Sequence, residues 1–177
     1  KTYGGSSIDE AKSIQQTTDG GYIVAGLTFS NDGDVTNNKG YIDAWILKLT
    51  TNGAIEWQKT YGGSAGDYLV NIKQTTDNGY IAVGYTGSNN GDIPNNQGDI
   101  DAWIIKIASN GNLEWSKTFG GSGNEWINDA QQTFNGEYLI AGYTFSNNGD
   151  ITNNLGYIDL WVIKLQTNGN LAWQKTY

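Results

Sequence analysis

The chain contains no histidine, cysteine, methionine or arginine among its 177 residues. These absences exclude a histidine base, a cysteine nucleophile, a thiolate or imidazole metal site and an arginine clamp for phosphate. Disulfides would indicate secretion, but a lack of cysteine does not argue against it, so the compartment stays open. The available chemistry is that of carboxylates, amides, hydroxyls, lysines and aromatic rings.

Positive charge is also scarce, with ten lysines against 18 acidic residues and a formal net charge of −8. Nucleic-acid binding needs a clustered basic face, and these lysines are scattered, so we expect no nucleic-acid partner. No apolar run approaches the roughly 20 residues that span a bilayer, and no signal-peptide pattern opens the sequence. We therefore expect no membrane insertion.

What the sequence does contain is an internal repeat. The hexapeptide Lys-Thr-Tyr-Gly-Gly-Ser occupies residues 1–6 and 59–64 and returns, with Phe119 in place of tyrosine, at 117–122. The 58-residue spacing divides the chain into repeats 1–58, 59–116 and 117–174, and residues 175–177 begin a further copy. Such self-similarity is typical of units that bury their apolar faces only against neighbours. We expect a piece of a longer array.

Turn signals divide each repeat into four short segments. In the first repeat, Gly- and Asn-rich turns and one long polar loop (29–42) separate predicted strands at 11–17, 22–28, 44–49 and 55–61. The second segment is apolar on both faces, which predicts a strand covered on both sides, whereas the fourth alternates apolar and polar residues. No segment keeps a helical period over three turns, so no helix is expected.

Four-stranded units of this kind occur in β-propellers, sandwich arrays and solenoids. The hairpins and the repeat length favour an all-β, propeller-like array of four-stranded antiparallel blades, one per 58-residue repeat. Trp45, Trp103 and Trp161 are expected to pack between blades. Propellers typically close with about four to eight blades. The predicted partner is therefore the protein itself, as a homo-oligomer, a filament or further blades.

Three motifs carry a family resemblance: Gly-Tyr-Ile-x-x-Gly at 21–26 and 79–84, Asp-x-Trp-x-x-Lys at 43–48, 101–106 and 159–164, and Asn-Gly-x-x-x-Trp. They resemble the Gly/Trp repeats of secreted surface proteins of Bacteroidota and some archaea, which often accompany a type IX secretion sorting domain. The blade ending in Trp is also similar to tryptophan-docking blades of quinoprotein-type propellers. The resemblance implies an extracellular or cell-surface location. Quinone-site arginine and cysteine are missing, so quinoprotein activity is not expected.

The long polar loop is the main candidate ligand site. Calcium binds six to eight oxygens from carboxylates, amides and carbonyls, and a glycine-punctuated Asp/Asn loop can supply them. The alternative is that the Asp and Asn side chains stabilise turns by bonding to their own backbone. Calcium would be the only cofactor. The candidate ligands, four per repeat, are Asp34, Asn37, Asn38, Asp43, Asp92, Asn95, Asn96, Asp101, Asp150, Asn153, Asn154 and Asp159.

Exposed aromatic rings beside Asp and Asn also suit carbohydrate, because rings stack on sugars while planar polar groups bond to their hydroxyls. Tyr41, Trp126 and Tyr157 are the candidate sugar contacts. Catalysis is not expected: a glycosidase needs two carboxylates in one constellation, and acids such as Asp9, Asp67 and Glu125 recur with the repeat or form no recognisable set.

The predicted function is that of a non-enzymatic extracellular structural or adhesive repeat module of a bacterial surface or secreted protein, displaying repeated polar loops on one face. Surface glycans or other surface proteins would be its external partners. The main alternative is a lectin-like carbohydrate-binding propeller. An engineered symmetric propeller and a glycosidase are weaker alternatives.

Overall fold

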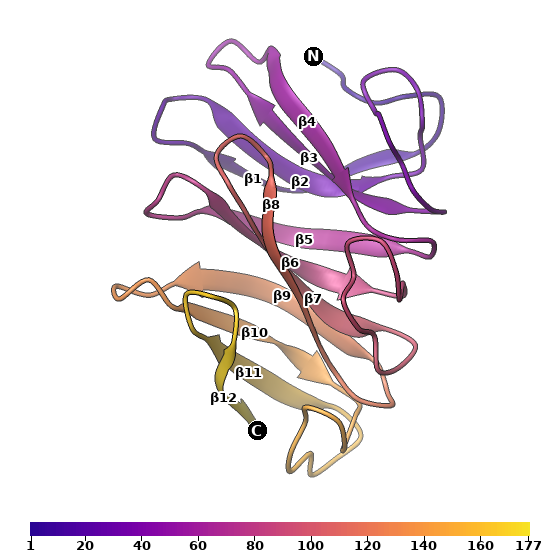
Figure 1. The fold of residues 1–177 in the computed structure, drawn as a ribbon, viewed down its shortest axis with the longest axis vertical. Helices are drawn as coiled ribbons and strands as arrows, with labels where there is room; N and C mark the ends of the chain where they lie inside the picture. Colours follow the sequence, from indigo (N-terminus) through magenta and orange to yellow (C-terminus); the bar gives the residue numbers. More distant parts are fainter.

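The computed structural model describes residues 1–177 and contains strands but no helix (Figure 1). Accordingly, no helix of the chain has the length and apolar character to cross a membrane. The strands are β1 (Asp9–Gln16), β2 (Tyr22–Thr28), β3 (Asp43–Leu49), β4 (Ile55–Tyr61), β5 (Asp67–Gln74), β6 (Tyr80–Thr86), β7 (Asp101–Ile107), β8 (Leu113–Phe119), β9 (Glu125–Gln132), β10 (Tyr138–Thr144), β11 (Asp159–Leu165) and β12 (Leu171–Thr176).

The strands form three four-stranded antiparallel sheets, each in sequence order: sheet I (β1–β4), sheet II (β5–β8) and sheet III (β9–β12). The predicted all-β class with four-stranded antiparallel units is confirmed. The sheets are stacked in a row without closing into a barrel, and the two termini lie at opposite ends of the stack (Figure 1).

Sheet boundaries are offset from the sequence repeat. The segment 59–61, which opens the second copy of the repeat, supplies the end of β4, and the segment 117–119, which opens the third copy, supplies the end of β8. Likewise, Lys175 and Thr176 belong to β12 of sheet III. The predicted segments 22–28 and 55–61 coincide with β2 and β4, while β1 and β3 begin earlier, at Asp9 and Asp43.

Each pair of neighbouring sheets packs through two apolar faces. We call the face that a sheet turns toward the next sheet its downstream face; in sheet I it comprises Ile23, Ala25, Ala44 and Ile46. The opposite, upstream face comprises, in sheet II, Leu69, Ile72, Tyr80, Ala82, Trp103, Ile105 and Ile107. The same positions join sheets II and III. Trp103 and Trp161 are buried between sheets, as predicted, whereas Trp45 is buried on the upstream face of sheet I, where no second sheet lies.

The second glycine of the Gly-Tyr-Ile-x-x-Gly motif has a steric cause. A Cβ atom at Gly26 or Gly84 would lie 1.8 or 1.9 Å from the backbone oxygen of Glu10 or Tyr68 on the neighbouring first strand. These residues lie opposite a register shift in that strand, where the backbones approach most closely. Only glycine fits there.

Candidate functional site

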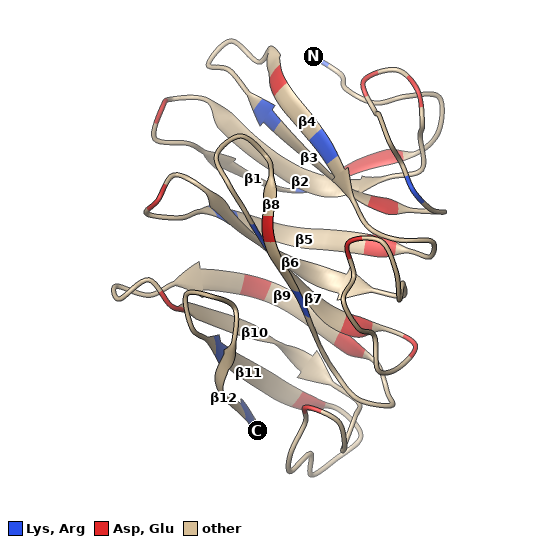
Figure 2. Cartoon of the chain, viewed as in Figure 1, with Lys and Arg blue, Asp and Glu red and all other residues tan.

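The three long loops (29–42, 87–100 and 145–158) project from one side of the stack, at the right in Figure 1. Figure 2 shows that many acidic residues gather on this side, whereas lysines are dispersed. We give the name loop rim to this surface, which comprises the three long loops, the Gly-Gly segments beneath them and the aspartate that begins the strand after each loop (Asp43, Asp101 and Asp159). It contains all of the predicted calcium ligands.

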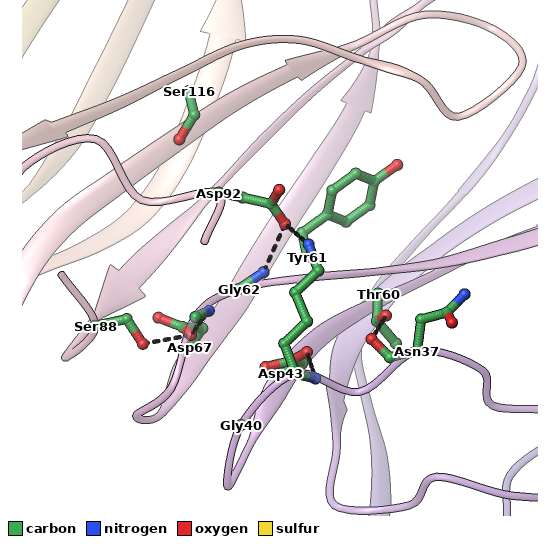
Figure 3. Close-up of polar contacts among 12 residues, drawn as sticks. Asn37, Gly40, Asp43, Thr60, Tyr61, Gly62, Asp67, Ser88, Asp92 and Ser116 are labelled. Atoms are coloured by element: carbon green, nitrogen blue, oxygen red, sulfur yellow. Dashed lines mark hydrogen bonds and ion pairs between the residues drawn. The ribbon is translucent and has the colours of Figure 1, made fainter. Parts of the chain in front are cut away.

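The loop rim is built by side chains that bind consecutive backbone N–H groups. In sheet II, Gly62 N–H donates to Asp92 Oδ2 at 3.0 Å (Figure 3). Gly63 N–H donates to Asp67 Oδ2 (2.7 Å) and Ser64 N–H to Asn90 Oδ1 (2.8 Å). The next amide, that of Ala65, donates to Ser88 Oγ at 2.8 Å. Four adjacent donors are thus satisfied without any ladder partner.

The same pattern recurs in the other two sheets. Residues 4–7 donate to Asp34, Asp9, Asp32 and Ser30, and residues 120–123 donate to Asp150, Glu125, Asn148 and Ser146. This bonding explains why the Gly-Gly-Ser segment and the Asp/Asn-rich loop recur together, because each satisfies the other.

The predicted calcium ligands are engaged in this bonding within each loop. In the first loop, the Asn37 carbonyl accepts a bond from Thr60 Oγ1 (2.8 Å) and Asn38 Nδ2 donates to the Ser30 carbonyl (3.1 Å). Asp43 Oδ2 accepts the Lys39 N–H at 2.7 Å (Figure 3). No three carboxylates of the structure are grouped so that they could hold a metal ion. These contacts fit the turn-forming alternative, and calcium stays a prediction.

Two carboxylate oxygens of the rim are exceptions. Asp43 Oδ1 and Asp101 Oδ1 are buried and have no hydrogen-bond partner. Burial raises the pKa of Asp43 to about 6; the Lys39 N–H bond opposes the rise, and the charge of Asp67 on the next sheet adds to it. Burial likewise raises the pKa of Asp101 to about 6, with Glu125 adding to the rise. Each of these two oxygens is free to bind a proton or a cation.

Two of the three aromatic residues predicted to contact sugar, Trp126 and Tyr157, lie along one row of rings. Trp126 on β9 stacks on Tyr143 (centroids 5.4 Å apart) and meets Tyr85 and Phe145 edge-on. Phe145 in turn packs edge-on against Tyr157, which is 82% exposed. The structure therefore brings Trp126 and Tyr157 together, with Phe145 between them.

Tyr41 lies toward the other end of this row. It packs edge-on against Phe29 (5.3 Å), and its charge contributes to the raised pKa of Tyr68, which burial chiefly causes. Tyr68 stacks on Tyr85 (4.8 Å). The row, called the aromatic row below, comprises Tyr68, Tyr85, Trp126, Tyr143, Phe145 and Tyr157. The sequence analysis missed Tyr68, Tyr85, Tyr143 and Phe145; their signal was the aromatic character of positions 68 and 126, where the first repeat has Glu10.

The second repeat lacks both members of an aromatic pair that the first and third repeats contain. Phe29–Tyr41 and Phe145–Tyr157 are equivalent pairs in the repeat, and both are edge-on. The second repeat has Gly87 and Asp99 at these positions. The two rings are present or absent together, as expected if each ring needs the other to cover it.

Comparisons with known proteins leave the family open. No protein-family model matches the chain, and no curated protein matches it. Among solved structures, it is similar to a protein of unknown function from Bacteroides caccae, with 14% identity over 95% of this chain and 67% of that chain and a TM-score of 0.42. At this level of similarity, no functional statement follows.

Proposed function

We propose that the chain is a non-enzymatic extracellular structural or adhesive repeat module of a bacterial surface or secreted protein, whose loops form a preformed display surface. The observation that carries the proposal is the threefold recurrence of four backbone amides, three bound by side chains of the long loop and one by the first residue of the next strand. Order in the free loops lowers the entropic cost of binding a partner, and repetition supplies avidity. The propeller-like arrangement of the blades is part of this proposal.

Burial of the acidic groups supports a non-enzymatic role. Asp43, Asp67, Asp101 and Glu125 are fully buried beneath the loops, so a substrate cannot reach their carboxylates without unfolding the rim. Enzymes place such groups in an accessible concave site. A localisation outside the cell rests on the family resemblance of the repeat motifs.

The test asks whether binding depends on the density at which the chains are displayed. Beads densely coated with the protein are assayed for retention on surface glycans and surface proteins, beside a panel of hydrolase substrates. We expect retention that depends steeply on coating density, with no turnover. Turnover that Asp67→Asn or Glu125→Gln abolishes would contradict the proposal.

A second candidate, carbohydrate binding, is favoured by the aromatic row. Ring faces of this kind hold the apolar side of a sugar, and the neighbouring loops offer Asp and Asn side chains. On a glycan array, Trp126→Ala and Tyr157→Ala should abolish binding if the row is a sugar site. Phe134→Ala is the matched control, because Phe134 is a fully exposed ring outside the row. An array with no hits leaves display without sugar binding.

A further inference from the structure

Two apolar faces of the stack lack the sheet that covers their equivalents. On the downstream face of sheet III, Leu139 is 39% and Leu160 52% exposed, whereas Ile81 and Ala102 at the same positions of sheet II are fully buried. On the upstream face of sheet I, Ile14 is exposed while Ile72 is buried. A groove of about 80 Å³ on that face is lined chiefly by Tyr3, Ala11, Val24, Trp45, Leu47 and Leu49, of which Val24, Trp45, Leu47 and Leu49 are already buried.

An aromatic contact recurs at both junctions between sheets. Trp57 of sheet I meets Tyr80 of sheet II edge-on, with centroids 6.1 Å apart, and Trp115 meets Tyr138 of sheet III at 5.8 Å. The next tryptophan in this series, Trp173, is 40% exposed on sheet III. The corresponding tyrosine on the upstream face of sheet I is Tyr22, which is only half-buried. Sheet III therefore carries the tryptophan of this contact without its tyrosine, and sheet I carries the tyrosine without its tryptophan.

A hydrogen bond from a tyrosine hydroxyl to a turn carbonyl also recurs with the repeat, and it too is incomplete at the two ends of the stack. Tyr61, at the end of β4, donates its hydroxyl to the Gly111 carbonyl in the hairpin turn of sheet II (2.5 Å). The corresponding Tyr177 is 68% exposed, with no such carbonyl beside it. The corresponding carbonyl on sheet I is that of Gly53, and Tyr3 occupies it at 2.5 Å. Tyr3 therefore shows that the upstream face of sheet I accepts this tyrosine.

The sizes of the side chains at the junctions indicate which residue fits against the upstream face of sheet I. At the two internal junctions, a small residue on the downstream face shares a core with a large one on the upstream face: Ala44 with Leu69, and Ala102 with Ile127. Parallel bridges between Ile42 and Gly66 and between Ile100 and Asn124 set these positions close together. Sheet III carries the larger Leu160, and sheet I carries the smaller Ala11. Leu160 fits opposite Ala11, whereas a leucine or isoleucine there would overpack it.

We propose that the downstream face of sheet III docks, head to tail, onto the upstream face of sheet I of a second copy of this chain. Trp173 packs against Tyr22 of the second copy, Leu160 packs opposite Ala11, and Tyr177 replaces Tyr3 at the Gly53 carbonyl. Because this contact joins two different faces, it gives a closed ring if the rotation closes and a filament if it does not. The inference goes beyond the proposed function, since it does not depend on what the loops bind.

The first test is the mass in solution, measured by sedimentation velocity over a concentration series. We expect self-association, and we expect Leu160→Asp to weaken it by about tenfold or more, since the charge would be buried at the contact. Leu160 is half exposed in the free chain, so the variant should fold. Tyr41→Asp is the matched control, placed on an exposed ring outside both faces. A wild-type chain that remains monomeric at every concentration overturns the proposal, as does association that survives Leu160→Asp unchanged.

A second test gains a contact. Lys39 binds Asp92 across the first junction (2.6 Å) and Gln97 binds Asp150 across the second (2.6 Å), but the equivalent residue of sheet III is Leu155. Leu155→Lys should therefore tighten association by pairing with Asp34 of the second copy, and the gain should disappear in Asp34→Asn. Association that is unchanged by Leu155→Lys would contradict the register.

The third test is covalent and uses the absence of native cysteine. A chain carrying Tyr22→Cys and Trp173→Cys should form disulfide-linked dimers or ladders on mild oxidation. The control carries Tyr41→Cys and Trp173→Cys and should not. Equal cross-linking of both proteins would show random collision and refute the specific contact.

Discussion

Asp43 of sheet I and Asp67 of sheet II direct their carboxylates at the same glycine. A Cβ atom at Gly62 would lie 2.6 Å from both Asp43 Oδ1 and Asp67 Oδ2, and both acids are fully buried. Asp101 and Glu125 repeat the arrangement around Gly120. The glycine therefore leaves room for two acidic groups at each junction, and Asp43 and Asp101 carry the cost of burial.

This burial predicts an unusual pH dependence. The pKa of Asp43 is raised from 3.8 to about 6 in the folded chain, mainly by burial, so the folded chain takes up this proton before the unfolded chain does. The contribution of Asp43 to the free energy of unfolding is therefore largest below pH 4 and is lost as the pH rises through 6. Asp101 acts in the same direction and range.

Replacing both acids with their amides should reveal this contribution. The double variant Asp43→Asn with Asp101→Asn should gain more free energy of unfolding over wild type at pH 8 than at pH 4. The gain at pH 8 should exceed the gain at pH 4 by about 2 kcal/mol or more. Urea denaturation at the two pH values measures it. Asp99→Asn, at an exposed position, is the control. An identical gain at both pH values would show that neither acid is perturbed.

One hydroxyl hydrogen bond of the first junction has no equivalent at the second. Tyr61 donates to the Gly111 carbonyl, but the equivalent residue at the second junction is Phe119, which cannot donate to Gly169. Tyr61→Phe should lower the free energy of unfolding by about 1 kcal/mol, and Phe119→Tyr should raise it by a similar or smaller amount. Denaturant titration of both variants checks the pair. Stabilisation by Tyr61→Phe would be inconsistent with the bond.

The lysine of the Asp-x-Trp-x-x-Lys motif loses its burial in sheet III. The side chain of Lys106 is 2% exposed and binds Asp77 (3.0 Å) and Glu114 (3.2 Å). Lys164 is 27% exposed and binds Glu137 alone (2.7 Å). Lys106→Ala should cost about 2 kcal/mol through lost bonds and stem packing, and Lys164→Ala about 1 kcal/mol or less. Equal losses on thermal or chemical unfolding would argue against this assignment.

The hydrogen bonding of the rim also predicts little response to chelation. Because loop side chains and backbone amides satisfy one another, removal of calcium should leave the melting temperature unchanged within about 1 °C. Differential scanning calorimetry with calcium and with chelator checks this expectation. A calcium-dependent rise that Asp43→Asn removes would instead place the ion between Asp43 and Asp67.

Local sequence signals predicted the strands well. The bounds of β2 and β4 followed from turn residues at 18–21 and 51–53, and the burial of Trp45 and its equivalents followed from their place in apolar strands. Asp43 lay between the predicted loop (29–42) and the predicted strand (44–49). In the structure it begins β3, and its carboxylate accepts the Lys39 N–H, which closes the loop onto the strand.

Contacts between repeats were beyond the reach of the sequence. The meeting of Asp43 with Asp67 joins residues from different sheets, and no spacing rule within one repeat reports it. The aromatic row likewise joins Tyr85 of sheet II to Trp126 of sheet III. The sheet boundary also could not be read from the repeat, because the segments 59–61 and 117–119, which open the second and third copies, complete the sheet before them.

The rigidity of the loop rim is measured most directly by site-resolved amide hydrogen exchange. Asp34, Asp92 and Asp150 each donate their N–H to the carbonyl of the first glycine below the loop, at 3.0, 3.0 and 2.8 Å. We predict that these three amides, together with those of Gly63 and Ser64, exchange as slowly as amides of the central strands. Exchange at the rate of an unstructured peptide would show that the loops are not preformed and would contradict the proposed display surface.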